Sequence, residues 1–234
     1  MQENDFDKFA EEYWASHARN IAVTGETPEF FAEYKVRDLA QLLWRPTLAA
    51  PRVLDFGSGV GNSIPWFHKY LLDPDVTCVD VSRKSLAIAK ERFPGLALFE
   101  HFDGRWLPLA DGSIDVAFAA CVFHHIPHAE HPGLLRELLR VLRPGGRLVI
   151  FEHNPINPLT VHAVNTCPFD ADAVLLRCGA LRQSFVASGF VNCKNRYRLF
   201  FPHFARVLRP LERYLGWLPL GAQYYVYGEK LEDY

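Results

Sequence analysis

The chain has 234 residues, of which 49% are hydrophobic and 22% charged, and its formal net charge is −2 at pH 7. This composition predicts an ordinary globular core and excludes a largely disordered chain. The near-neutral charge gives no reason to expect a nucleic acid as partner. The longest apolar run, "IDVAFAACVF", is too short to span a bilayer, so no transmembrane segment is expected.

Cysteine usage and the first residues of the sequence indicate a cytoplasmic protein. The chain has five cysteines, an odd number, and no C-x-x-C pair. Such cysteines are expected to be reduced and mostly buried thiols, as in cytosolic proteins. The first stretch, "MQENDFDKF", is acidic and polar, unlike a secretory signal. We therefore predict a cytoplasmic location.

Residues 1–48 are predicted to form two helices. In "DFDKFAEEYWASHARN" the aromatic residues recur at helical spacing and share one face. The stretch "GETPEFFAEYKVRDLAQLL" predicts a second helix, with Thr27 as its N-cap and Pro28 at its first position. The N-terminal part of the chain is therefore expected to be entirely helical.

Between residues 49 and 154, short apolar strands alternate with helical segments. The expected strands are "PRVLDFG", "VTCVDV", "LALFEHFD", "SIDVAFAACVF" and "RLVIFEH", and helices such as "RKSLAIAKERF" and "HPGLLRELLRVL" lie between them. This alternation predicts βαβ units and a doubly wound parallel sheet of the α/β class. Near-continuous apolar strands suit a sheet that is covered on both faces.

Residues 155–234 are predicted to complete the same domain and to shape a pocket for a substrate. A helix is expected over residues 168–189, followed by the strands "VNCKNRYRLFF" and "QYYVYGE". Between these strands lies an amphipathic helical insertion at about 202–221, which mixes apolar and aromatic residues with arginines. Its apolar side is expected either to cover the sheet or to lie on a membrane surface, so peripheral membrane contact is left open.

The stretch "VLDFGSGVG" combines an apolar strand with a glycine loop and precedes a helix. Gly57, Gly59 and Gly61 let the backbone approach a ligand closely, and the helix offers free N–H groups to an anion. A dinucleotide pyrophosphate and an amino-acid carboxylate both fit. The spacing is G-x-G-x-G, which differs from the dinucleotide fingerprint G-x-G-x-x-G. Asp55 beside the loop would repel a pyrophosphate and attract an ammonium group, which favours an amino acid such as the methionine part of S-adenosylmethionine.

Five motifs in order resemble those of class I S-adenosylmethionine-dependent methyltransferases of the small-molecule type. They are "VLDFGSGVG", "CVDVS", "FDGRWLPLADGSIDVAFA", "CVFHHI" and "LRVLRPGGRLVIFE", and together they cover roughly residues 53–152. The resemblance implies a Rossmann-like, mostly parallel seven-stranded sheet with an antiparallel last strand. It also implies that residues 1–48 form a helical lid, that the cofactor is S-adenosylmethionine, and that its product is S-adenosylhomocysteine.

The resemblance assigns parts of the cofactor to particular residues. The glycine loop and Asp55 would hold the methionine end, and Asp80 would bind the ribose hydroxyls. Asp103 would accept a hydrogen bond from the adenine amino group, with Gly104 against the ring. Tyr13 would either close over the sulfonium, where an aromatic face favours a cation, or pack on the domain. The full set of implied cofactor-binding residues is Asp55, Gly57, Ser58, Gly59, Gly61, Asp80, Val81, Asp103, Gly104, Cys121 and Tyr13.

Histidines gather where an acceptor should lie, just after two strands. The turn "FHHIPHAEH" contains four of them, and "FEHNP" adds another. Imidazole transfers protons near neutral pH, so His124, His125 and His153 are candidate bases for an acceptor that starts protonated. The spacing H-H-x-x-H-x-x-H also resembles a metal site. However, Pro127 and Pro132 interrupt any helical register and no cysteine or carboxylate pattern completes the set, so no metal is predicted.

The sequence thus predicts methyl transfer from S-adenosylmethionine to a small-molecule or lipid-linked acceptor. Oxygen is favoured as the methylated atom because histidines crowd the predicted pocket. Two alternatives are open: a partner protein that binds the cofactor without turning it over and, less favoured, a nicotinamide-dependent oxidoreductase. Neither the acceptor nor the oligomeric state follows from the sequence.

Overall fold

The computed structural model describes residues 25–43 and 50–232, so the predicted first helix and Tyr13 lie outside the described residues. Seven strands form one sheet in the order β3-β2-β1-β4-β5-β7-β6. β7 runs antiparallel to both of its neighbours, and every other neighbouring pair is parallel. This confirms the predicted doubly wound α/β sheet with an antiparallel last strand. The strands are β1 (Arg52–Phe56), β2 (Asp75–Asp80), β3 (Leu98–His101), β4 (Ile114–Ala120), β5 (Leu142–His153), β6 (Val191–Arg198) and β7 (Gln223–Glu229).

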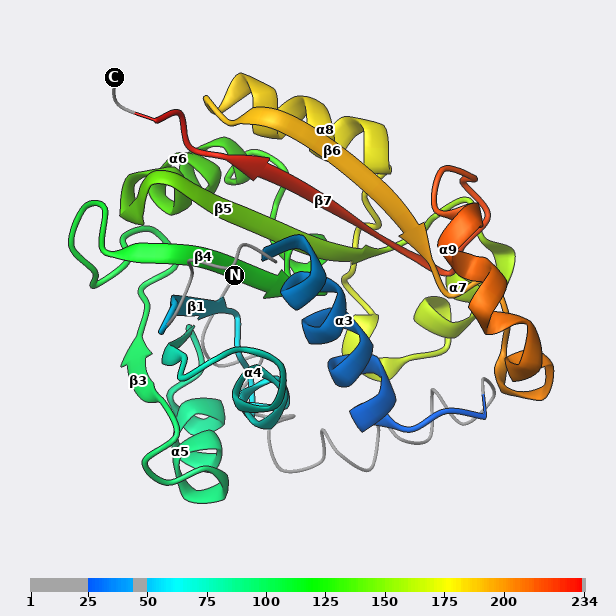
Figure 1. Cartoon of the computed structure of the whole chain (residues 1–234), viewed down its shortest axis with the longest axis horizontal. Helices are drawn as coiled ribbons and strands as arrows, with labels where there is room; N and C mark the ends of the chain where they lie inside the picture. Colours follow the sequence, from blue (N-terminus) through cyan, green and yellow to red (C-terminus); the bar gives the residue numbers. More distant parts are fainter. Residues whose placement is uncertain (1–24, 44–49, 233–234) are drawn as a thin grey trace.

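Helices cover both faces of this sheet (Figure 1). α3 and α4 pack beside each other on one face, and α6 and α8 pack on the other. The backbone N–H of Phe30 in α3 donates to Oγ1 of Thr27 at 3.4 Å, which confirms the predicted N-cap. The α-helices are α3 (Pro28–Leu43), α4 (Ile64–Tyr70), α5 (Arg83–Arg92), α6 (His131–Val141), α7 (Pro158–Asn165), α8 (Cys178–Ala187) and α9 (Glu212–Leu215). The 3₁₀ helices are η2 (Phe123–His125), η3 (Pro168–Asp170) and η4 (His203–Leu211).

Each central strand divides its side chains between two apolar layers, because successive residues of a strand point to opposite faces. In β4, Val116 and Phe118 pack in the layer beneath α3 and α4, whereas Ala117 and Ala119 pack in the layer beneath α6 and α8. All four side chains are fully buried. Burial on both faces explains why these strands appear in the sequence as continuous apolar runs.

The helix predicted over residues 168–189 is wrong in its first half, because α8 begins only at Cys178. In the preceding segment the N–H of Val174 donates to the carbonyl of His124 at 2.8 Å. The hydroxyl of Tyr224 donates to the carbonyl of Leu176 at 2.7 Å. Hydrogen bonds to other parts of the fold thus take the place of the helical ones and hold this segment against η2.

The predicted insertion at about 202–221 folds as η4 and α9, beside the ends of β6 and β7 (Figure 1). The buried carboxylate of Glu212 anchors it by accepting hydrogen bonds from the N–H groups of residues 199–201. No residue of η4 is buried, and the side chains of Phe204 and Trp217 are 89% and 75% exposed. The apolar residues of η4 therefore do not cover the sheet, and that interpretation of the insertion is wrong.

All five cysteines are free thiols, as expected. Within residues 25–43 and 50–232, no helix has the length and the apolar character needed to cross a bilayer. The cytoplasmic location and the division at residues 48 and 154 stay predictions.

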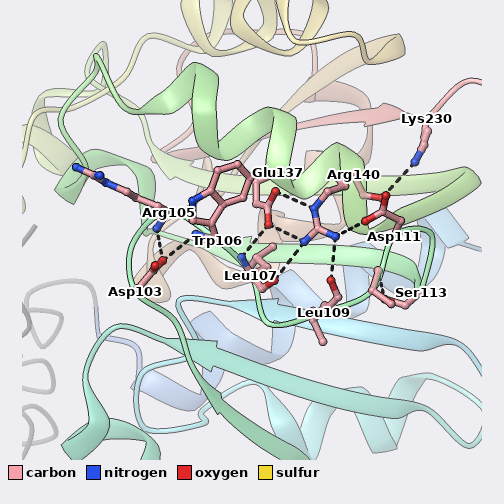
Figure 2. Close-up of polar contacts among 11 residues, drawn as sticks. Asp103, Arg105, Trp106, Leu107, Leu109, Asp111, Ser113, Glu137, Arg140 and Lys230 are labelled. Carbon is pink, nitrogen blue, oxygen red and sulfur yellow. Dashed lines mark hydrogen bonds and ion pairs between the residues drawn. The ribbon is translucent and has the colours of Figure 1, made fainter.

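The loop between β3 and β4 is held against α6 by a pair of charged residues (Figure 2). The buried carboxylate of Glu137 accepts a hydrogen bond from the N–H of Leu107 at 2.8 Å. Arg140 pairs with Glu137 through Nε at 2.9 Å and through Nη2 at 2.6 Å. The same guanidinium donates to the carbonyls of Leu109 at 2.9 Å and of Leu107 at 3.2 Å. This network fixes the course of the loop, whose first residues include Asp103.

Replacing Arg140 with methionine should lower the free energy of unfolding by about 2–3 kcal/mol, because Glu137 and two backbone carbonyls lose a charged hydrogen-bond donor. Urea unfolding measures this change. Arg136 is an exposed arginine on the same helix, and its replacement with alanine should change the free energy by less than about 0.5 kcal/mol. Equal stability of the two variants would show that the network contributes nothing beyond a surface charge.

Candidate cofactor and acceptor site

A cavity of about 890 Å³ opens at the carboxyl edge of the parallel strands. It is lined by the ends of β1, β2 and β4 and by residues of α3, α7, η3 and η4. Gly61 does not line it: a Cβ there would meet Ile64 and Ala89, so this glycine lets α4 and α5 pack closely. The predicted site residues that line the cavity are Asp55, Gly57, Ser58, Gly59, Asp80, Val81, Asp103, Gly104, Cys121, His124, His125 and His153.

The glycine loop is fastened to the end of β2. The N–H groups of Gly57 and Ser58 both donate to the carbonyl of Val79, at 2.9 and 3.1 Å. Gly57 and Gly59 have φ values of +70° and +52°, a backbone region that favours glycine. At Gly57 a Cβ would lie 2.6 Å from Val122, whereas at Gly59 a Cβ would meet nothing within 4 Å. Gly57 is thus required by the fold, and Gly59 leaves open space in the cavity.

Two buried carboxylates flank this loop. Asp80 accepts hydrogen bonds from the N–H groups of Gly59 and Ser82, each at 2.8 Å. Asp55 is only 2% exposed, and its Oδ2 has no hydrogen-bond partner among the described residues. Burial, with a smaller contribution from the charge of Asp80, raises the pKa of Asp55 to about 8. Near neutral pH the Asp55 carboxyl therefore keeps its proton unless a cationic group lies beside it.

Asp103 and Gly104 form a turn at the mouth of the cavity. Oδ1 of Asp103 accepts hydrogen bonds from the N–H groups of Arg105 and Trp106, both at 2.8 Å (Figure 2). These bonds hold the pKa of Asp103 below its usual range. Gly104 has a φ of +87°, and a Cβ there would meet nothing within 4 Å. The turn thus presents a fixed carboxylate and a bare stretch of backbone to the cavity.

Beyond β4 the cavity contains a buried group of polar side chains around Cys121. Nζ of Lys35 lies 3.3 Å from Sγ of Cys121, and Nε2 of Gln223 lies 3.3 Å from Nδ1 of His153. Burial by itself would raise the pKa of Cys121, but the charges of Lys35 and His153 outweigh it and lower the pKa to about 7. Gln223 was not among the predicted site residues, because nothing in the sequence brings β7 to this edge.

The second polar group surrounds His124, which is buried between two carboxylates. Its Nδ1 lies 2.6 Å from Oε2 of Glu152, and its Nε2 lies 3.6 Å from Oδ1 of Asp170. Nε2 of His125 lies 3.5 Å from the same Asp170 oxygen. Burial lowers the pKa of His124, but Glu152 and Asp170 outweigh it and raise the pKa to about 10. Because both ring nitrogens of His124 face carboxylates, this histidine is poorly placed to take a proton from an acceptor.

Asp170 was missed at the sequence level. It belongs to the stretch "CPFDAD", which includes the first turn of the helix predicted over residues 168–189. The local signal is an acidic residue directly after an aromatic one in an apolar segment. This signal indicates a site residue only when the structure shows that η3 lies beside η2.

Comparisons with known proteins agree with this geometry. Residues 54–150 match a family described as a methyltransferase domain. The chain is 40% identical over 121 residues to trans-aconitate 2-methyltransferase of Methylobacterium nodulans, a match that covers 51% of this chain and 45% of that protein. It is 32% identical over 126 residues to a ubiquinone/menaquinone biosynthesis C-methyltransferase of Ectopseudomonas mendocina, with 50% and 48% covered.

Residues 54–150 carry a methyltransferase domain, and the sheet as a whole has the class I methyltransferase fold. An S-adenosylmethionine-dependent methyltransferase of Thermotoga maritima has the same fold, with a TM-score of 0.68, 19% identity, and 97% of this chain and 98% of that chain covered. The chain spans about half the length of the curated relatives that it matches. The residues of the methyltransferase domain that match the family include the glycine loop, Asp80 and Asp103, whereas Asp170 and η4 lie outside the match.

The two loop glycines should respond differently to substitution. Gly57→Ala should lower the melting temperature clearly, because its methyl group collides with Val122. Gly59→Ala should fold with a loss of about 1–2 kcal/mol for its left-handed backbone, yet bind S-adenosylhomocysteine at least about tenfold more weakly. Thermal unfolding and isothermal calorimetry separate the two effects. Wild-type affinity in Gly59→Ala would show that the open space beside this glycine is not used by the cofactor.

Proposed function

We propose that this protein transfers the methyl group of S-adenosylmethionine to an oxygen atom of a small amphiphilic acceptor, with lipid-linked molecules as the favoured class. The observation that carries the proposal is one continuous cavity, which joins the carboxylate-flanked glycine loop to a polar interior and to an apolar mouth. The named acceptors of the similar proteins differ from one another, so the acceptor is argued from the cavity itself.

The residues present fit the cofactor. The unpartnered oxygen of Asp55 suits the ammonium group of the methionine part, and the open space at Gly59 leaves room for its backbone. Asp80 is proposed to bind the ribose hydroxyls, and the turn of Asp103 and Gly104 to receive the flat adenine. S-adenosylmethionine supplies a methyl group bound to a sulfonium. The thioether that leaves when this methyl group is transferred needs no acid catalyst.

The residues of the chain mainly have to orient the acceptor against the methyl group. Alignment of two reacting groups supplies roughly 7–11 kcal/mol in favourable cases. When the acceptor is a hydroxyl, its proton also has to be removed. His153 lines the cavity next to Cys121 and, unlike His124, has neither ring nitrogen within 4 Å of a described carboxylate oxygen. We therefore propose that His153 is the base that accepts the proton of the acceptor hydroxyl.

The mouth of the cavity favours an acceptor with an apolar part. Phe204 of η4 and Leu159 of α7 line the cavity while most of their surface faces water. Leu220 does not line the cavity but is also exposed, and its carbonyl accepts a hydrogen bond from Asn157, the N-cap of α7, at 2.8 Å. Exposed apolar side chains that continue from a cavity wall to the surface mark a site for an apolar ligand or a membrane. A chain-like substituent of the acceptor would cover this surface, while its polar end reaches the interior.

The affinity for S-adenosylhomocysteine should depend on pH through Asp55. Its pKa of about 8 in the free protein means that binding an ammonium group at lower pH must release a proton. Affinity should therefore rise by up to about tenfold per unit between about pH 6 and pH 8 and then level off. Calorimetry in buffers with different ionisation enthalpies counts the proton released. In Asp55→Asn the slope should vanish, and an equally steep slope in that variant would contradict the assignment.

Acceptor turnover should depend on the apolar mouth. In a screen that detects S-adenosylhomocysteine formation across phenols, sugars, amines and polyprenyl-linked compounds, we expect the long-chain hydroxyl compounds to react. The double change Phe204→Ser and Leu159→Ser should raise KM for these acceptors at least about fivefold, because the lost apolar contacts are together worth at least about 1 kcal/mol. Short-chain analogues should be unaffected.

Val186 of α8 provides the matched control, since it is equally apolar and 61% exposed but does not line the cavity. Val186→Ser should leave KM unchanged. Tight cofactor binding without turnover of any acceptor would instead support the alternative of a partner protein that binds the cofactor without activity. Equal KM values of the wild-type protein for long-chain and short-chain acceptors would count against the lipid-linked class, but not against methyl transfer itself.

A further inference from the structure

Three ligand-type atoms converge on one point of the cavity wall. Nε2 of His124 and Nε2 of His125 lie 3.6 and 3.5 Å from Oδ1 of Asp170, and all three atoms lie within 4.8 Å of one another. In a tetrahedral zinc site with bonds of about 2.0–2.1 Å, neighbouring ligand atoms are about 3.3 Å apart. The observed spacing therefore needs only small side-chain movements to close around an ion.

We propose that His124, His125 and Asp170 bind a divalent transition-metal ion of the zinc type. Two imidazoles and one carboxylate form a donor set that suits zinc and iron(II), whereas magnesium and calcium prefer oxygen ligands. Because the three residues line the cavity, the remaining coordination position faces the space that an acceptor occupies. An oxygen of the acceptor, or a water, is the ligand that this position would take.

Glu152 supports this proposal from behind His124. Metal-binding histidines usually donate their second ring N–H to a carboxylate, which fixes the ring and the tautomer. Here Nδ1 of His124 lies 2.6 Å from Oε2 of Glu152, and Oε1 of Glu152 accepts the N–H of Phe123 at 2.8 Å. The carboxylate is fully buried and orients the imidazole so that Nε2 points into the cavity wall beside Asp170.

The backbone around the three residues is also fixed. Nε2 of His131 lies 3.0 Å from the carbonyl of Phe123 and 2.9 Å from that of Ile126, which closes the turn that contains η2. The N–H of Val174 bonds the carbonyl of His124 and so ties the segment after η3 to the same turn. Two separate parts of the chain are thereby held at the distance that the ligand set requires.

The expectation of no metal rested on the prolines that interrupt the spacing H-H-x-x-H-x-x-H and on the lack of a cysteine or carboxylate pattern that completes it. The structure shows that His128 is exposed and that His131 is engaged with backbone carbonyls, so these two histidines do not complete a site. The third ligand is instead Asp170, 45 residues beyond His125 in the numbering. The fold supplies a partner that no local spacing contains.

Metal binding is tested on the untagged full chain after dialysis against a chelator. Zinc and cobalt(II) are titrated separately by calorimetry, and the metal retained after gel filtration is counted by mass spectrometry. We expect about one ion per chain, with cobalt giving the visible absorption of a four-coordinate site. Asp170→Asn and His125→Ala should each weaken binding at least about a hundredfold, and Glu152→Gln should weaken it about 10–100-fold.

His128→Ala is the matched control, because it removes an exposed histidine that lies three residues beyond His125. Its affinity for zinc and cobalt(II) should equal that of the wild type. Each variant is first shown to bind S-adenosylhomocysteine, whose proposed ligands lie elsewhere, so that a loss of metal is not a loss of fold. No retained metal, or binding that Asp170→Asn leaves unchanged, would overturn the proposal and leave the cluster as a set of ion pairs. The metal site does not depend on methyl transfer, so bound metal without any turnover would argue only against the proposed function.

Discussion

The burial of two carboxylates at the carboxyl edge of the sheet is the constraint on which the site depends. Asp55 and Asp80 end adjacent strands, and a charge buried there is costly unless it is paired. Asp80 obtains one N–H donor from Ser82 and a second, from Gly59, because the glycine loop turns back against the end of β2 with φ values that other residues avoid. Oδ2 of Asp55 has no such partner among the described residues, and burial favours the protonated carboxyl. One carboxylate is thus satisfied by the fold and the other is not, and this difference is the reason to propose an amino-acid zwitterion rather than linked phosphates as the ligand of the cleft.

The cavity has two halves with different origins in the chain. Residues 54–150 build the cofactor half in one continuous stretch and match the family along that stretch. The acceptor half draws on α3, η3, η4 and β7, which lie outside the match. This is why the acceptors of trans-aconitate and quinone methyltransferases cannot be transferred to this chain, and why Asp170 and Phe204 weigh more in the argument than any named relative.

The sequence predicts best where a local rule and the tertiary structure agree. Strands buried on both faces, the N-cap at Thr27 and the glycine loop all follow from patterns within a few residues, and the structure confirms them. The helix prediction over 168–189 failed in its first half because long-range hydrogen bonds with His124 and Tyr224 outweighed its helical propensity. The expectation that the apolar side of the insertion covers the sheet failed as well. Amphipathicity shows that a helix has an apolar side, but it does not show what covers that side. The roles of the individual site residues, the lid and the domain boundaries stay predictions.

The interior of the cavity contains two separate polar groups that an acceptor can contact. Lys35 and Cys121 lie against the end of β4, while His124 and His125 follow in η2 and Asp170 lies beside them from η3. A metal ion at the second group would lower the pKa of a bound hydroxyl, so that His153, between the groups, receives the proton more readily. An apolar molecule would leave these buried charges without solvent or partner, and a wholly polar one would leave Phe204 and Leu159 exposed. An amphiphile with an oxygen at its polar end satisfies both halves of the acceptor space, which is the physical reason to look for the substrate in that class.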